Sequence, residues 1–362
     1  LITFEKEFNL SNAKKLKNKL EEDTQIKWIY FKYHNNILYK FYDFIKLILF
    51  TLFLSKKNNI NFIHCRSYFP AISIYFLNHF LKYNFLFDIR DFWADEGIEI
   101  KKYKIIYKLV KLLEGKIIQK SCHVVCLTQK AKNFILNKYS STHQISKNKI
   151  TVIPCGTEFN LFNPHNLKKN LRNKIQRDLK LKNRNVLLYY GSIGENYLID
   201  KMINFFRVLK SYDKSWIFLF LINNDHDYLR EKLNNSGLHN NFYQITSSNR
   251  KNLPYYLSLS DLSIFYYRQG MRSIGCSPTK LADLFAMNVP VITSNYLGDM
   301  DKIIKFSRNY SCLIDSSQKS IIINNVKKII SIKDKSLIRK NSKYFDFLSG
   351  TNKYKNIYKL FI

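Results

Sequence analysis

Short, continuous apolar runs alternate along the chain with longer stretches in which apolar residues recur every three or four positions. A run such as 216–222 is typical of a strand buried on both faces of a parallel sheet, and the longer stretches are typical of amphipathic helices. This alternation predicts an α/β fold with doubly wound parallel sheets. The predicted strands are 26–31, 60–65, 85–89, 123–127, 150–153, 186–190, 216–222, 242–246, 262–267, 289–293 and 312–314.

A polar, strongly basic run at 166–185 separates two series of predicted strands. It has no strand pattern, so we expect a partly helical linker. Each series is long enough for a Rossmann-like domain, whose ligands bind beyond the carboxyl ends of the strands. The predicted organisation is one such domain at 1–165, a linker at 166–184, a second domain at 185–345 and a terminal helix at 346–362 that packs back toward the first domain.

The segment 276–294 is the most informative part of the chain. Ser277 is a good helix N-cap, and Pro278 suits the first helical position, where its missing N–H is not needed. The residues that follow have one apolar face at helical spacing. Asn288 and Pro290 end this helix, and a strand follows.

The start of this helix predicts an anion site. Unpaired N–H groups and the helix dipole favour negative charge there, and Lys280 adds a full positive charge. Asp283 lies on a similar face, about 7 to 8 Å along the axis from Pro278 at 1.5 Å per residue. That distance resembles the span from a pyrophosphate to a ribose. The alternative is an ordinary amphipathic helix with no ligand.

The run from Ser277 to Lys280 resembles the donor-sugar site of family 4 glycosyltransferases. The resemblance implies a GT-B fold, a nucleotide sugar bound by the C-terminal domain, an acceptor bound by the N-terminal domain, and retention of anomeric configuration. Asp283 stands where the family usually has the Glu that binds the ribose hydroxyls. Gly275 stands where many members have a second Glu, so that role is not carried over.

Further segments match the family's motifs in the family's order. Ile153-Pro154-Cys155-Gly156-Thr157-Glu158 resembles the signature that closes the N-terminal domain, with Glu158 in place of Asp. Leu188 to Gly194 resembles the first strand and glycine turn of the donor domain. The other matching segments are 61–71, 87–96, 124–128, 162–164 and Gly298-Asp299.

Donor-site roles follow from the resemblance and from residue chemistry. Gly191 and Gly194 would let the backbone approach the donor. Arg272, in a polar loop that we expect to be flexible, would stabilise the leaving diphosphate, although an ordinary solvated arginine is equally compatible with the sequence. The predicted donor-binding residues are Gly191, Gly194, Arg272, Ser277, Pro278, Thr279, Lys280 and Asp283.

The acceptor side is predicted from an acidic cluster at a strand exit, unusual in so basic a chain. Asp91 stands about where related enzymes place a residue facing the transferred sugar, so Asp91 and Arg90 are the predicted catalytic residues. The alternative is that Asp91 caps a helix or pairs with Arg90. We expect no metal and no cofactor, with the nucleotide diphosphate sugar as substrate. The cluster consists of Asp88, Arg90, Asp91, Asp95 and Glu96.

Composition fits this interpretation. A chain of 362 residues, 46% of them hydrophobic, is long and apolar enough to form two globular domains. Six cysteines without a C-x-x-C pair indicate neither a disulfide framework nor a zinc site. The chain begins without a signal-peptide pattern, so we expect a cytoplasmic protein. The apolar stretch 44–54 is too short to cross a bilayer and predicts a helix on a sheet or at a membrane surface.

The net charge of +32 indicates an anionic surface as a partner. No zinc-finger, RRM-like or basic-zipper pattern is present, so we expect no nucleic acid. Anionic lipid fits better, which predicts a peripheral protein at the inner face of the cell membrane. A composition rich in Lys and Asn without a particular partner is the alternative. The basic residues next to apolar ones are found at 40–57 and at Lys101, Lys102, Lys104, Lys108 and Lys111.

The sequence therefore predicts a glycosyltransferase that moves a sugar from a nucleotide diphosphate sugar to a glycan or lipid-linked acceptor in surface-polysaccharide synthesis. Two alternatives stay open. One is a nucleotide-sugar epimerase on the same fold, which would need no acceptor. The other is a catalytically silent GT-B subunit that binds a partner or a polyanion.

Overall fold

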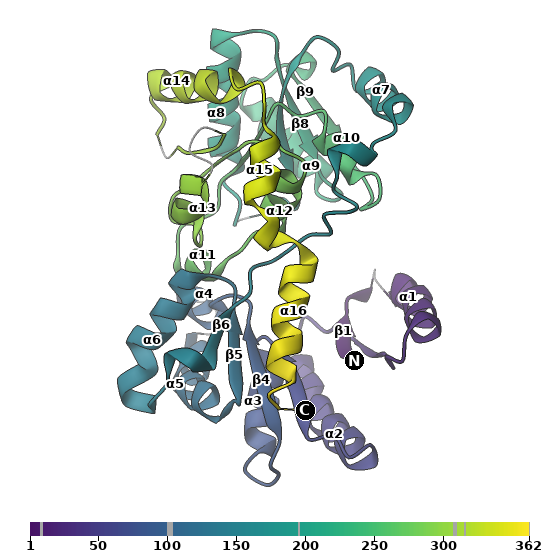
Figure 1. The fold of residues 1–362 in the computed structure, drawn as a ribbon, viewed down its shortest axis with the longest axis vertical. Helices are drawn as coiled ribbons and strands as arrows, with labels where there is room; N and C mark the ends of the chain where they lie inside the picture. Colours follow the sequence, from purple (N-terminus) through teal and green to yellow (C-terminus); the bar gives the residue numbers. More distant parts are fainter. Residues whose placement is uncertain (8–9, 100–103, 195, 307–309, 315, 362) are drawn as a thin grey trace. The chain divides into compact units, whose positions relative to one another are not determined.

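The computed structural model describes residues 1–7, 10–99, 104–194, 196–306, 310–314 and 316–361 (Figure 1). The chain forms two compact units, Leu1–Phe87 and Asp88–Ile362. The division falls inside strand β4 (Asn84–Ile89). The predicted boundaries at 165, 184 and 345 stay predictions.

The first unit begins with a strand that the sequence analysis missed. β1 (Ile2–Glu5) pairs in parallel with β2 (Ile29–Lys32), with Ile2 opposite Ile29. The predicted strand at 26–31 is thus present but starts later. The other elements are α1 (Leu10–Asp23), α2 (Ile37–Lys57), β3 (Phe62–Arg66) and α3 (Tyr68–Leu77).

Helix α2 contains the apolar stretch 44–54. Asn36 caps it, with its side-chain oxygen accepting from the Leu38 N–H at 3.0 Å. Among the described residues, no helix has the length and apolar character required to cross a membrane. The prediction of a helix at 44–54 is confirmed.

The second unit contains a six-stranded sheet with the order β12-β11-β10-β7-β8-β9. All its pairings are parallel. Read from the centre outward, this is the strand order of a Rossmann-like sheet. Its strands are β7 (Asn185–Tyr190), β8 (Trp216–Leu221), β9 (Tyr243–Thr246), β10 (Leu262–Phe265), β11 (Val291–Thr293) and β12 (Cys312–Leu313).

Every strand of this sheet lies within or next to a predicted range. β8 is buried at all of its positions, as its uninterrupted apolar sequence requires. The connecting helices are α8 (Ile199–Tyr212), α9 (His226–Asn235), α10 (Leu253–Leu257), α11 (Met271–Gly275), α12 (Thr279–Ala286), α13 (Met300–Phe306), α14 (Lys319–Ile330) and α15 (Ser336–Asn341).

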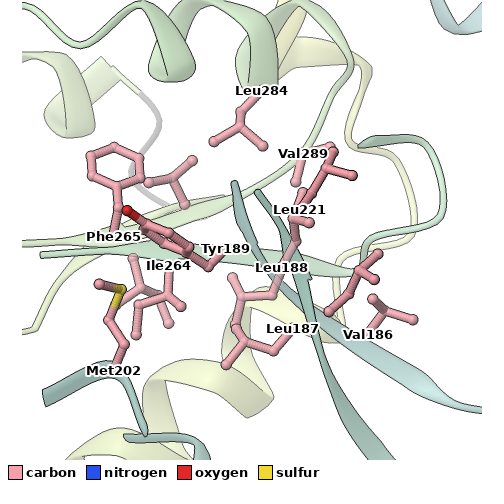
Figure 2. Packing of buried hydrophobic residues seen from close by; sticks show 14 of the residues in the cluster. Val186, Leu187, Leu188, Tyr189, Met202, Leu221, Ile264, Phe265, Leu284 and Val289 are labelled. Carbon is pink, nitrogen blue, oxygen red and sulfur yellow. The ribbon is translucent and has the colours of Figure 1, made fainter. Parts of the chain in front are cut away.

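The core of this unit lies on both faces of the sheet. Figure 2 shows Leu284 of α12 on one side of the strands and Met202 of α8 on the other, with Leu187 and Leu188 of β7 between them. The exposed fraction of each of these four side chains is 0%. Both faces of the sheet are therefore covered, which explains the continuous apolar runs in its strands.

The second unit also contains β5 (His123–Cys126), which pairs in parallel with β6 (Ile150–Val152). The predicted linker contains helix α7 (Lys169–Asp178), which confirms that it is partly helical. Helix α16 (Phe347–Tyr358) lies at β6, where Lys353 Nζ donates to Val152 O at 3.2 Å. The helices between β4 and β6 are α4 (Trp93–Glu99), α5 (Lys104–Lys120) and α6 (Gln129–His143).

Candidate active site

The helix predicted after Ser277 is α12, but its first turn differs from the prediction. Pro278 is the N-cap, with φ −68° and ψ 123°, and lies outside the helix. Ser277 does not cap it, because its hydroxyl oxygen accepts from the Cys155 N–H at 3.2 Å. The prediction of Ser277 as N-cap and Pro278 as first helical residue is wrong, since the extended Pro278 backbone makes Thr279 the first helical residue.

Lys280, the second residue of α12, is 8% exposed, and its Nζ has no hydrogen-bond partner among the described residues. Burial lowers the pKa of Lys280 to about 7. We call the rings around Nζ the aromatic cage. Their centroids lie at 4.5 Å (Tyr197), 4.7 Å (Tyr189), 5.6 Å (Phe265) and 5.6 Å (Tyr267).

Gly191 brings the backbone against this amine. A Cβ on Gly191 would lie 2.9 Å from Lys280 Nζ, and its φ of +122° is one that other residues rarely adopt. Around Gly194, by contrast, no atom of the residues that the structure describes lies within 4 Å of the position a Cβ would take. The glycine turn after β7 is thus tight at its first glycine and open at its second.

Asp283, about one turn further along α12, is buried and accepts hydrogen bonds from two neighbouring side chains. Arg250 donates two hydrogen bonds to it, Nη1 to Oδ2 at 2.6 Å and Nη2 to Oδ1 at 2.8 Å. The Tyr190 hydroxyl donates to Oδ2 at 2.7 Å. The Asp283 side chain is 2% exposed and that of Arg250 is 48% exposed.

Arg250 and Tyr190 were not among the site residues predicted from the sequence. A signal for Arg250 was present, because it follows β9 by four residues and so lies near the carboxyl edge of the sheet, where ligands bind. Its guanidinium also donates to Thr157 Oγ1 at 2.8 Å and lies 4.2 Å from the centroid of the Phe162 ring. Arg250 therefore links α12 to the segment of the Ile153–Glu158 motif.

Arg272 lies in α11, so the prediction of a flexible loop there is wrong. The turn is held by the Ser273 hydroxyl, which donates to Gly270 O at 2.7 Å. Two carboxylates neutralise Arg272: its Nε lies 3.3 Å from Asp91 Oδ2, and its Nη1 donates to Glu96 at 2.9 and 3.0 Å. The structure thus brings the predicted catalytic Asp91 and the predicted donor-site Arg272 together.

The acidic cluster does not line one cleft. Asp95 pairs with Lys111 at 2.8 Å, away from Arg272, because neighbouring positions on α4 point in different directions. Asp88 lies 3.4 Å from Arg90 and accepts from the Tyr354 hydroxyl at 3.0 Å. Only Asp91 and Glu96 of the cluster contact Arg272.

Burial raises the pKa of Asp91 above its ordinary value, and the positive charge of Arg272 opposes this shift. Asp91 pairs with Arg272 rather than with Arg90, whose Nη2 instead lies 3.3 Å from Cys155 Sγ. The alternative of an Asp91–Arg90 pair is therefore wrong.

A pocket of about 160 Å³ adjoins these residues. Its lining includes Tyr197 and Tyr267 of the aromatic cage and Arg272. Arg268 adds a second positive side chain to the lining, and Glu96 and Glu99 are its two negative ones. The pocket therefore lies directly against the residues around Lys280, at the carboxyl edge of the six-stranded sheet.

Residues at the start of α6 contact the segments on either side of α12 in the chain. The Thr128 hydroxyl donates to Ile274 O at 2.8 Å. Asp299 accepts from the Gln129 N–H at 2.6 Å and from the Lys130 N–H at 3.0 Å. Asp299, from the predicted Gly298-Asp299 motif, thus satisfies the first two amides of α6.

Among the described residues, no three His, Cys, Asp or Glu side chains are placed to hold a metal ion. All six cysteines are free in this structure.

The fold has many relatives among solved structures. A glycosyltransferase from Rickettsia africae ESF-5 is 17% identical, with a TM-score of 0.70 over 99% of this chain and 97% of that one. Anabaena HepE, solved with UDP and glucose, is 12% identical, with a TM-score of 0.68 over 94% and 88%. WaaG, a glycosyltransferase involved in lipopolysaccharide biosynthesis, is 14% identical, with a TM-score of 0.55 over 80% and 81%. A search of curated sequences finds no match.

These likenesses confirm the predicted GT-B fold, with its Rossmann-like parallel sheets. The sequence profile of the family described as glycosyl transferases group 1 matches residues 171–358, more than half of the chain. That range contains the whole six-stranded sheet together with Lys280, Asp283, Arg250 and Arg272. The chain is a glycosyltransferase and belongs to the glycosyl transferases group 1 family.

Proposed function

We propose that this glycosyltransferase takes a nucleotide diphosphate sugar as its donor and binds the diphosphate at Lys280. The observation that carries this proposal is the buried Nζ of Lys280, which has no acceptor among the described residues and lies against Gly191, where no side chain intervenes. A diphosphate would supply the missing acceptor with opposite charge. HepE, a relative in fold, was solved with UDP and glucose.

The other predicted donor residues keep their places in this proposal. Asp283 binds a ribose hydroxyl through Oδ1, which accepts one hydrogen bond from Arg250 and has a second lone pair. Arg272 exchanges part of its contact with Asp91 and Glu96 for the leaving diphosphate as transfer proceeds. The first turn of α12, beside the diphosphate, is shaped by Ser277, Pro278 and Thr279. Gly194 leaves room for the sugar.

On the acceptor side we propose Asp91 as the carboxylate that faces the transferred sugar, with Arg90 behind it. Transfer retains anomeric configuration and needs neither metal nor cofactor, because Lys280 and Arg272 supply the positive charge. The acceptor is a glycan or lipid-linked sugar of a surface polysaccharide. The likeness to WaaG and the family 4 motifs support this class.

We further propose that the protein works as a peripheral protein at the inner face of the cell membrane. Helix α2 carries an exposed apolar stripe at helical spacing, with Leu38, Tyr42, Ile45, Leu49 and Phe53. Its last turn adds Lys56 and Lys57. Such a helix fits an anionic lipid surface.

Helix α5 repeats this pattern with exposed Ile105, Leu109 and Leu112. The side chain of Lys111, however, is only 10% exposed and is paired with Asp95 and Glu114. The prediction that Lys111 is one of the lipid-facing lysines is therefore wrong. Lys101 and Lys102 lie outside the described residues.

The test is an incubation of the purified protein with a panel of nucleotide sugars, with and without isolated lipid-linked acceptor. Transfer, or slow donor hydrolysis to nucleoside diphosphate, supports the proposal. Release of an epimerised free sugar without acceptor would identify the enzyme as an epimerase. No turnover and no binding of any nucleoside diphosphate would overturn the proposed donor.

A further inference from the structure

We propose that binding of a nucleoside diphosphate at Lys280 takes up a proton from solvent, so that donor affinity falls as the pH rises above neutrality. The inference rests on the proposed function, since it concerns the same donor site. The chemistry is a single proton transfer. The Lys280 amine lone pair accepts a proton, and the buffer acid that gave it becomes its conjugate base.

The geometry leaves the ammonium form of Lys280 poorly compensated before a ligand binds. Its Nζ is surrounded by rings and finds no acceptor among the described residues. Cation–π attraction of about 0.5–2 kcal/mol replaces only part of the lost hydration of an ammonium. The carboxylate on its own helix, Asp283, is already engaged by Arg250 and Tyr190.

The groups facing Lys280 from the packed elements are the phenols of Tyr189, Tyr197 and Tyr267 and the thiol of Cys276. Burial raises the pKa of Cys276 to about 12 and raises the pKa of Tyr189 and of Tyr267 far above the ordinary value. These three groups do not titrate between pH 7 and 9. The Tyr189 hydroxyl is also fixed by donating to Ser192 O at 2.5 Å.

A bound diphosphate changes this balance, because it places negative charge and acceptor oxygens at Nζ. Since burial lowers the pKa of Lys280 to about 7 in the free protein, most of the amine is neutral at pH 8. An opposite charge in contact restores the charged form. By linkage, the protein then takes up about one proton per ligand at pH 8, and the dissociation constant rises about tenfold per pH unit above 7.

Calorimetry measures this directly. Uridine diphosphate is titrated into the protein at pH 8 in buffers of different ionisation enthalpy, and the slope of observed heat against ionisation enthalpy gives the protons taken up. At pH 8 the diphosphate is fully ionised, since the second phosphate pKa is about 6, and so contributes none. Adenosine, guanosine and thymidine diphosphates are titrated as well, because the base is not assigned.

Two variants and one control make the result specific. Lys280→Arg keeps its charge at every pH, so it should bind with no proton uptake and little pH dependence. Lys280→Met should bind the diphosphate weakly, also without proton uptake. It serves as the second variant if arginine does not fit at this position. Lys210→Met is the matched control, because Lys210 also lies over a ring, Phe242 at 3.5 Å, but is not enclosed. It should behave as the wild type.

The expected result is a slope near one for the wild type and Lys210→Met, and near zero for both Lys280 variants. Tight binding by the wild type with zero slope and flat affinity between pH 7 and 9 overturns the inference alone. The same uptake in Lys280→Arg also overturns it. Failure of all four diphosphates to bind overturns the proposed function and the inference with it.

Discussion

Two buried ionisable residues of opposite charge type lie three residues apart on α12, and they differ in their hydrogen-bond partners. Asp283 receives two hydrogen bonds from Arg250 and one from Tyr190. Lys280 has no comparable partner among the described residues. A compensated buried charge holds structure together, whereas an uncompensated one costs stability until a ligand arrives. The two residues therefore predict opposite effects of substitution.

Lys280→Met should stabilise the free protein at neutral pH. The pKa of Lys280 is lowered in the folded protein, so the unfolded chain binds more protons between pH 7 and about 10, and wild-type stability rises with pH there. The slope is about 1.4 kcal/mol per pH unit for one proton. Urea unfolding at several pH values should show this slope in the wild type and lose it in Lys280→Met. A less stable variant at pH 7 would contradict the expectation.

Arg250→Met should destabilise the protein, because it leaves the Asp283 carboxylate buried with only the Tyr190 hydroxyl. We expect a loss of about 1–3 kcal/mol, below the value for a fully buried pair because half of the Arg250 side chain is exposed. Arg230→Met, at an exposed position on α9, is the control and should change stability by less than about 0.5 kcal/mol. Chemical denaturation of both variants measures this, and equal stability would show that water replaces Arg250.

For single residues, the sequence allowed site residues to be predicted better than their hydrogen-bond partners. Lys280 and Asp283 could be singled out because helix spacing places them on one segment. Their neighbours could not, since Arg250 and Asp283 are 33 positions apart in the chain and meet only when it folds. Ser277 was misassigned for a related reason: its hydroxyl finds the Cys155 amide, which lies 122 positions away.

Among elements, buried strands were the most predictable. A strand covered on both faces, such as β8, must be apolar throughout, and its sequence shows this directly. β1 was missed because every one of its four residues is only partly buried and its sequence, ITFE, has no distinctive run. The order of the strands across the sheet cannot be inferred from any single apolar run in the sequence. It became known only from the structure.

Helix α2 should carry binding to anionic liposomes. Lys56→Glu with Lys57→Glu should weaken that binding by at least about 2 kcal/mol, or roughly 30-fold, at about 1 kcal/mol for each lysine. Leu49→Ser with Phe53→Ser should weaken binding to both anionic and neutral vesicles, because it removes apolar contact.

The matched control for α2 is Lys14→Glu with Lys15→Glu on α1, where both lysines are exposed but no comparable apolar stripe accompanies them. Vesicle co-sedimentation at two salt concentrations measures all variants. Binding that is independent of lipid charge and of salt would exclude the membrane proposal, and preferential binding to duplex DNA would favour a nucleic acid.

On the scale of the whole molecule, donor binding and transfer should be separable. Lys280→Ala should weaken nucleoside diphosphate binding by about 1.5–3 kcal/mol, the range for a charge-assisted hydrogen bond. Asp91→Asn should leave that affinity the same or tighter, because it frees Arg272 from one carboxylate, while reducing transfer. Calorimetry and a transfer assay are compared for each variant. Loss of nucleotide binding in Asp91→Asn alone would contradict the assignment.

Metal removal should leave donor affinity and transfer nearly unchanged. The positive charge at the proposed diphosphate site comes from Lys280 and Arg272, so a divalent cation has no required place there. The measurement is the transfer rate after EDTA treatment and after adding back magnesium or manganese. A loss restored by either metal would show that the enzyme uses one.

The capping of α6 by Asp299 has a consequence for synthesis on the ribosome. The two amides that Asp299 satisfies precede it in the chain by 170 and 169 positions. At roughly 5–20 residues per second, the ribosome reaches Asp299 about 10–30 s after it has made the start of α6. During that interval water must solvate those amides, and the first turn of α6 frays. A nascent chain stalled before residue 299 should therefore exchange the Gln129 and Lys130 amides rapidly, whereas release of the full chain should protect them.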